Sequence, residues 1–147
     1  MKIAIASDHA GFELKSHLAT ALAAAGHEVV DLGTDGTASV DYPRFAEPAA
    51  ELVADGGAER GVLVCGSGNG VAIVANKVHG VRAVNAHDVE EAEMSRRHND
   101  ANVVTLSGAR LSGDEADAIV ATFLSTDFDG GRHARRVDQI TAMETPA

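Results

Sequence analysis

Several features are scarce in this sequence, and each scarcity excludes a class of protein. Cys65 is the single cysteine among 147 residues, so no disulfide forms within the chain, which is typical of a reducing cytoplasm. No apolar run approaches the ~20 residues of a membrane-spanning helix. The net charge of −10 argues against general nucleic-acid binding, which requires a basic surface. The apolar N-terminal run is too short for a signal peptide and has no cleavage site, so we expect a cytoplasmic protein that binds neither membrane nor nucleic acid.

What the sequence does contain is a regular alternation of strand and helix patterns. Strands are expected at residues 2–6, 27–32, 60–65, 81–86 and 103–106, with a helical pattern after each. Because helical crossovers join parallel strands, the predicted fold class is α/β. The expected architecture is a three-layer α/β/α sandwich, with a Rossmann-like five-stranded parallel sheet and a C-terminal helical arm. The 147 residues are enough for a single domain, in which residues 127–147 form the arm, at a dimer interface.

The helix boundaries carry signals of their own. Gly26 follows the first helical pattern at a C′ position, which favours glycine. Ser112 and Glu115 have the spacing of a capping box. Pro48 interrupts the second helical pattern, so the regular helix either begins near Glu47 or is kinked.

The most distinctive stretch is the loop after the third strand, where Cys65 precedes three alternating glycines and a helical pattern. This order places backbone N–H groups where they hold an anion and stabilise a thiolate. The alternative for Cys65 is a small buried hydrophobe. A dinucleotide site with Asp88 on the ribose is the competing interpretation, but the spacing is G-x-G-x-G rather than G-x-G-x-x-G. A P-loop is excluded because no Gly-Lys-Ser/Thr follows.

Ligands of open parallel sheets bind at the carboxyl ends of the strands. The residues expected there are Asp8, His9, Cys65 to Gly70, His87, Asp88 and Ser107 to Arg110. Separately, residues 132–136 carry three arginines in an acidic chain, which indicates either a solvated basic turn or an anion site. The histidines show no regular zinc-site spacing, so we expect no metal.

A set of short motifs occurs in a fixed order along nearly the whole chain. They are Ser7-Asp8-His9-Ala10-Gly11, Asp41-Tyr42-Pro43, Cys65-Gly66-Ser67-Gly68-Asn69-Gly70, Ala75-Asn76-Lys77, Arg82-Ala83, His98-Asn99-Asp100-Ala101-Asn102 and Gly130-Gly131-Arg132-His133. Each motif is short, but the ordered set is specific. Together they resemble the type B ribose-5-phosphate isomerase family, which also includes the galactose-6-phosphate isomerase subunits.

The resemblance implies an aldose–ketose isomerase that works through a cis-enediol(ate), without metal or organic cofactor. It implies that Cys65 is the base between C2 and C1, and that His98 is the acid that helps to open the furanose ring. Ser67 then assists proton movement between O1 and O2, and Asp8 contacts the sugar at the ring-opening end. The backbone of Gly66 to Gly70 forms the anion hole for the enediolate.

The resemblance also implies the binding residues and the assembly. The positions that correspond to substrate or phosphate binding are His9, Tyr42, Asn99, Arg110, Arg132 and Arg136. The family is homodimeric, so we expect a homodimer, or a dimer of dimers, with sites built from both subunits. Some members carry a glutamate base where this chain has Val71, and others carry threonine where it has Ser67. In this chain, Cys65 is therefore the only one of the two family bases that is present.

The motifs leave the substrate open. The expected pair is D-ribose 5-phosphate and D-ribulose 5-phosphate, and the alternatives are galactose 6-phosphate, allose 6-phosphate or a tetrose phosphate. A non-catalytic nucleotide-binding α/β module is a further alternative. The presence of both Cys65 and His98 argues against such a module, because it needs neither a base nor an acid. Residues Asn85, His87 and Asp88 are left without an assigned role.

Overall fold

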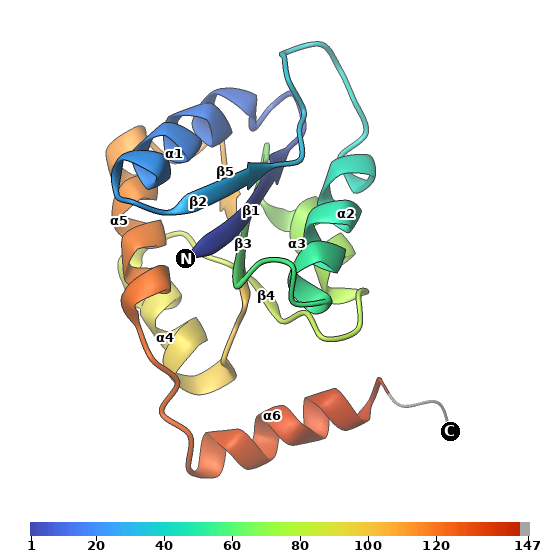
Figure 1. The fold of residues 1–147 in the computed structure, drawn as a ribbon, viewed down its shortest axis with the longest axis vertical. Helices are drawn as coiled ribbons and strands as arrows, with labels where there is room; N and C mark the ends of the chain where they lie inside the picture. The colour runs from blue at the N-terminus through green and yellow to red at the C-terminus, as the bar shows by residue number, and fades with distance from the viewer. Residues whose placement is uncertain (145–147) are drawn as a thin grey trace.

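A computed structural model describes residues 1–144 of the chain (Figure 1). Its strands are β1 (Lys2–Ser7), β2 (Glu28–Asp31), β3 (Arg60–Cys65), β4 (Ala83–Asn85) and β5 (Val103–Ser107). Its helices are α1 (Phe12–Ala24), α2 (Pro43–Ala54), α3 (Asn69–Asn76), α4 (Val89–Asn99), α5 (Gly113–Ser125) and α6 (Arg132–Ala142). The last three residues of the predicted arm lie outside the described residues.

The five strands form one parallel sheet in the order β2-β1-β3-β5-β4. Helices α1, α4 and α5 cover one face, and α2 and α3 cover the other (Figure 1). The predicted three-layer α/β/α fold is therefore confirmed. Strand β4 is shorter than predicted and lies at the sheet edge. None of the helices in residues 1–144 is long and apolar enough to cross a membrane.

The two faces of the sheet have cores of different composition. The side of α1, α4 and α5 packs large side chains such as Leu18, Ile119 and Phe123. The side of α2 and α3 is rich in alanine, including Ala46 and Ala49 of α2. Small side chains let helix and strand backbones approach closely, so α2 lies tight against β1 and β3.

The predicted helix boundaries are mostly correct. The hydroxyl of Ser112 accepts from the Glu115 N–H, and the Glu115 carboxylate accepts from the Ser112 N–H, which completes the predicted capping box. Gly26 lies just beyond α1 with φ of 93°, as a C′ glycine does. A start of the second helix near Glu47 was wrong. Helix α2 begins at Pro43, in the first turn where proline is tolerated, and continues through Pro48.

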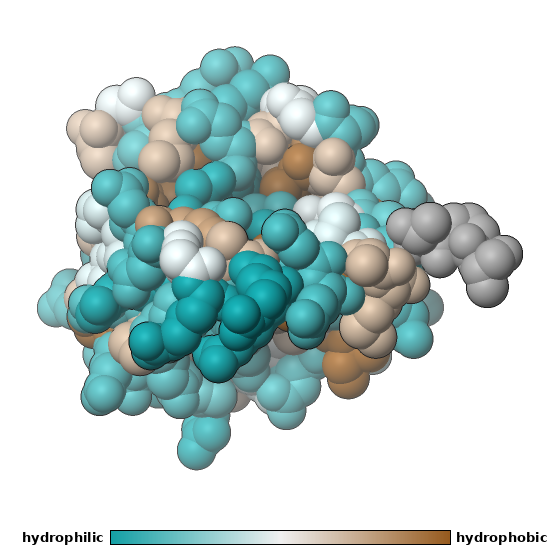
Figure 2. Space-filling view, turned by 90° about the horizontal axis from the view of Figure 1, so that it is seen from below, coloured by the Kyte–Doolittle hydropathy of each residue, from teal (hydrophilic) through white to brown (hydrophobic). Residues whose placement is uncertain are grey.

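The C-terminal arm, α6, lies beyond the amino ends of the strands (Figure 1), and Glu144 after it accepts the Gly80 N–H at 3.0 Å. The segment before it is attached to α4, because the Asp129 N–H donates to the Arg97 carbonyl at 3.0 Å and the two side chains form an ion pair at 3.2 Å. Figure 2 views this side of the molecule and shows mainly hydrophilic residues, with hydrophobic ones beside the C-terminal end. Ile140 and Met143 are the large exposed hydrophobic residues of this segment.

Candidate functional site

The first cluster of candidate residues lies at the carboxyl edge of the sheet. Asp8 follows β1, Cys65 ends β3 and pairs with Ser107 of β5, and Asn85 ends β4. Four neighbouring strands therefore deliver polar side chains to one edge. This is the position at which open parallel sheets bind their ligands.

Close backbone contacts hold the loops of this edge together. A Cβ on Gly11 would lie 2.6 Å from the Val64 carbonyl oxygen, and one on Gly108 would lie 2.8 Å from the Ala10 carbonyl oxygen. Only glycine permits these approaches. The Asp8 carboxylate, which is buried, accepts the Gly11 N–H at 3.0 Å and closes the turn after β1.

Cys65 is buried at the base of the glycine loop, and its sulfur is held by that loop. The Gly68 N–H donates to the Cys65 Sγ at 3.2 Å, and Gly68 has φ of 80°, a conformation that favours glycine. The exposed Ser67 hydroxyl accepts the Asn69 N–H at 3.1 Å. A donor that points at the sulfur strengthens its bond when the thiol loses its proton, because the acceptor becomes charged.

Other N–H groups of the same loop are available to a ligand. Within residues 1–144, the backbone N–H groups of Ser67, Gly70 and Val71 have no hydrogen-bond acceptor. The last two lie in the first turn of α3, where the helix dipole favours negative charge. The loop can therefore hold an anion next to the thiol.

Three further candidates lie at the same edge of the sheet. The ring of Tyr42 packs on the Gly70 backbone, since a Cβ there would lie 2.6 Å from the Tyr42 Cζ. The Nδ1 atom of His9 accepts the Val40 N–H at 3.1 Å, so a neutral His9 ring carries its proton on Nε2, from which it can donate to a ligand. Arg110 is exposed beyond β5 and lines a cavity of about 380 Å³ with His87.

The second cluster lies at the opposite end of the sheet. His98 and Asn99 end α4, which returns the chain to the amino end of β5. The first residue of β5, Val103, pairs with Gly61, and the four residue steps from there to Cys65 span about 13 Å. One chain therefore does not bring His98 and Cys65 together. Arg132 and Arg136 lie one turn apart on α6, exposed and, within residues 1–144, without an acidic partner.

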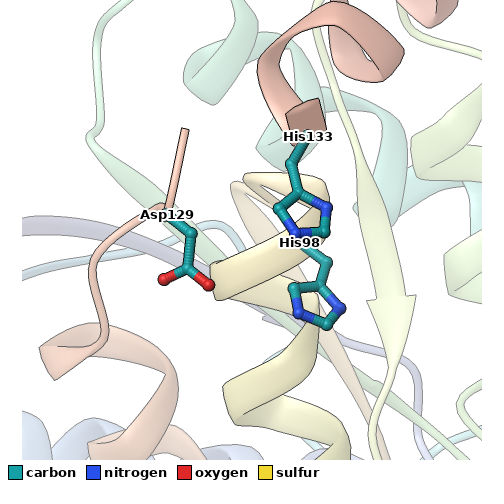
Figure 3. A group of neighbouring side chains, drawn as sticks. All are labelled: His98, Asp129 and His133. Carbon is teal, nitrogen blue, oxygen red and sulfur yellow. The ribbon is translucent and has the colours of Figure 1, made fainter. Parts of the chain in front are cut away.

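His98 lies against His133, a residue of the last motif to which no role was assigned. The rings of His98 and His133 are stacked, with centroids 4.2 Å apart and planes within 9° of parallel, and the Asp129 carboxylate lies beside them (Figure 3). The pKa of His133 is lowered, first by desolvation and then by the positive charges of His98, Arg132 and Arg136, while Asp129 opposes the shift. The His-His-Asp set has the donor types of a transition-metal site. However, the nitrogen lone pairs of two stacked rings lie in separate parallel planes and do not converge on one point. The Asp129 carboxylate is also paired with Arg97, so the three residues are poorly arranged to bind a metal ion.

Several motif residues have structural roles that explain why the second cluster is rigid. The Asn76 amide forms two hydrogen bonds with the backbone of Ala83, which attaches α3 to the edge strand. The Arg82 guanidinium donates to the carbonyls of Asn99 and Asp100, which holds the end of α4. These residues support the site without belonging to it.

Sequence reasoning missed the roles of three side chains at the first cluster. Ser107 was expected at this edge but had no assigned role, Asn85 had none either, and Thr105 was not considered, yet all three donate to carbonyls of the glycine loop. The available signal was a hydroxyl at two alternate positions of a buried strand, where an apolar residue would be expected.

Comparison with known proteins shows that the chain belongs to a known family. The family described as "Ribose/Galactose Isomerase" matches residues 3–140. The chain is 44% identical to ribose-5-phosphate isomerase B of Escherichia coli over 144 residues, which cover 97% of this chain and 96% of that protein. It is 40% identical to D-erythrulose-4-phosphate isomerase of Pectobacterium atrosepticum, covering 98% and 95% of the two chains. The solved structure of Clostridium thermocellum ribose-5-phosphate isomerase B superposes with a TM-score of 0.96 at 48% identity, covering 98% and 97%.

Proposed function

Since the chain belongs to the ribose/galactose isomerase family and is a sugar-phosphate isomerase, we propose that it interconverts D-ribose 5-phosphate and D-ribulose 5-phosphate. The observation that carries this proposal is the 44% identity over nearly full length to an enzyme named for that reaction. The Pectobacterium relative, at 40%, makes a four-carbon sugar phosphate the second candidate. Both reactions move a hydrogen between adjacent carbons and need the same site chemistry.

In the proposed mechanism, Cys65 is the base. Its thiolate removes the proton from C2 of the open-chain aldose and returns it to C1, while Ser67 moves a proton between O2 and O1. The Ser67 oxygen already accepts the Asn69 N–H, so its own proton is free for this transfer. A positioned base contributes roughly 10²–10⁴-fold to such a reaction.

The glycine loop stabilises the negative charge that this step creates. The N–H groups of Ser67, Gly70 and Val71, which have no acceptor within residues 1–144, are available to the enediolate oxygens, and each such donor is worth about 10²–10³-fold. Asp8 contacts the sugar at the end where the ring opens. His9, Tyr42 and Arg110, which lie at the same edge of the sheet, contact the rest of the substrate.

We further propose that one site uses two subunits. One subunit supplies Cys65 and its loop, and the partner supplies the ring-opening acid His98 with Asn99, and the phosphate ligands Arg132 and Arg136. The support for this is the separation of the two clusters at opposite ends of one sheet. The exposed Ile140 and Met143 line a groove of about 730 Å³ between α6 and the body, which is suited to a subunit interface.

A substrate panel tests the function. Pentose, tetrose and hexose phosphates are assayed at equal concentration with the wild type and with Cys65→Ala. We expect the highest kcat/KM on ribose 5-phosphate, and a loss of at least about 10²-fold in kcat for the variant. A higher kcat/KM on a tetrose or hexose phosphate would replace the substrate assignment. Near-normal kcat in Cys65→Ala would contradict the role of the thiol.

A further inference from the structure

We propose that Asn85, Thr105 and Ser107 are positioning residues that set the orientation of three consecutive peptide groups in the glycine loop, and thereby aim its N–H groups at the reacting atoms. This inference rests on the proposed function of the loop as an oxyanion hole. None of the three side chains touches the substrate. Their effect passes through the backbone of residues 66–69, and Asn85 additionally donates to the Asn69 side chain at 2.8 Å.

The evidence is a row of hydrogen bonds from two adjacent strands. The Ser107 hydroxyl donates to the Gly66 carbonyl at 2.6 Å. The Asn85 amide donates to the Ser67 carbonyl at 3.1 Å, and the Thr105 hydroxyl donates to the Gly68 carbonyl at 2.9 Å. Each carbonyl from residue 66 to residue 68 therefore has its own side-chain donor from β4 or β5.

Because the peptide bond is planar, these contacts to the carbonyls also fix the directions of the neighbouring N–H groups. In a trans peptide the C=O and the following N–H point in opposite directions. A carbonyl fixed toward β4 and β5 therefore fixes the next N–H on the other side. The row of donors also keeps three carbonyl oxygens, which would repel an enediolate, away from the anion.

Each of the three N–H groups has a different task. The N–H of Ser67 has no acceptor in the described residues and is free for the enediolate. The N–H of Gly68 donates to the Cys65 sulfur. The N–H of Asn69 donates to the Ser67 hydroxyl. Three side chains thus align the oxyanion donor, the base and the proton-transfer hydroxyl together.

Burial makes this arrangement hard to explain as ordinary packing. Thr105 is 0% exposed and Ser107 is 1% exposed, and a buried hydroxyl is costly unless it is bonded. Apolar residues occupy the other positions of β5, Val103, Val104 and Leu106. Glycine is also required at position 68, because a Cβ there would overlap the Asn85 Oδ1.

The test deletes the buried hydroxyl without changing the size of the side chain. Thr105→Val removes the donor to the Gly68 carbonyl, Thr105→Ser restores it, and Thr20→Val is the matched control. The Thr20 hydroxyl donates to a helix carbonyl of α1, away from the site. We expect kcat of Thr105→Val to fall about 10- to 100-fold with KM within twofold, since oxyanion donors act on the transition state. Thr105→Ser should recover most of kcat, and Thr20→Val should match the wild type.

Binding of two inhibitors separates alignment from a general loss of structure. One is a phosphorylated hydroxamate, a planar anion that mimics the enediolate, and the other is the alditol phosphate, which has no such charge. Thr105→Val should weaken the hydroxamate about 10- to 100-fold and the alditol phosphate less than twofold. Ser107→Ala, which removes the side-chain donor to the Gly66 carbonyl and leaves only the Ala109 N–H on it, should give the same pattern.

Two results would overturn the inference. One is a Thr105→Val enzyme with wild-type kcat and wild-type hydroxamate affinity. The other is an equal loss for both inhibitors without rescue by Thr105→Ser, which would indicate a merely structural role. A wild type that isomerises no sugar phosphate would instead contradict the proposed function, so the two failures are distinguishable.

Discussion

The imidazole rings of His98 and His133 are stacked with centroids 4.2 Å apart, which joins the end of α4 to the start of α6. Both rings are half-buried, and His133 also lies near Arg132, Arg136 and Asp129. Protonation of His133 would place a positive charge beside Arg132 and Arg136. The contact is therefore favoured when His133 is neutral.

The first prediction is that the free energy of unfolding depends on pH through His133. The pKa of folded His133 is lowered from 6.5, chiefly by desolvation, so the unfolded chain binds more protons in the window below 6.5. The free energy of unfolding should fall as the pH is lowered through this window. The measurement is the urea midpoint from pH 7.5 to pH 5.5 for the wild type and for His133→Phe, which keeps a flat ring but does not titrate. Equal slopes for the two proteins would show that His133 is not responsible.

The second prediction concerns the shared site. Cys65→Ala and His98→Ala homodimers should each be nearly inactive. After subunit exchange at equal amounts, half of the dimers are mixed, and each mixed dimer has one site with both residues intact. Activity should recover to roughly one quarter of the wild type, as twofold symmetry requires. Mixing two preparations of the same variant is the control, and a mixture that stays inactive after exchange would mean that each site lies within one subunit.

The third prediction concerns phosphate recognition by α6. Arg136→Ala should raise KM for the phosphorylated sugar roughly 10- to 100-fold, because a hydrogen bond to a charged group is worth about 1.5–3 kcal/mol. Its kcat should change little, since the phosphate does not react. Arg135→Ala, on the same helix and equally exposed, is the matched control and should keep wild-type KM. An Arg136→Ala variant with unchanged KM would remove Arg136 from the site.

The fourth prediction concerns stability. Ser112→Ala removes the capping box of α5 and should lower the free energy of unfolding by about 1 kcal/mol. Ser125→Ala, which removes a hydroxyl at the other end of the same helix, should cost less than half of this, since its bond is to an exposed helix carbonyl. Urea unfolding of the two variants compares them directly. Activity should be unaffected, and equal stability of the two variants would mean that the cap contributes no more than the Ser125 hydroxyl does.

Local patterns were sufficient for most of the fold. Alternating apolar strands and amphipathic helices predict a parallel sheet covered on both faces, and that sheet predicts which loops meet at its carboxyl edge. Asp8 and Cys65 could be placed together on this basis. Of the two alternatives for Pro48, a helix start near Glu47 was wrong: α2 continues through Pro48, because its alanine-rich face is buried against the sheet, which is a tertiary effect.

By itself, the sequence determined the fold class, the family motifs and the identity of the thiol with its glycine loop, because these depend on residue types at short spacing. Only the tertiary structure decided that His98 lies at the opposite end of the sheet from Cys65. The reason is the direction of α4, which returns the chain from the carboxyl edge to the amino edge, so that its last turn, with His98, lies far from the loop after β3. It also revealed that the Thr105 hydroxyl donates to the loop. Strand register, which no local pattern encodes, brings residues 68 and 105 into contact.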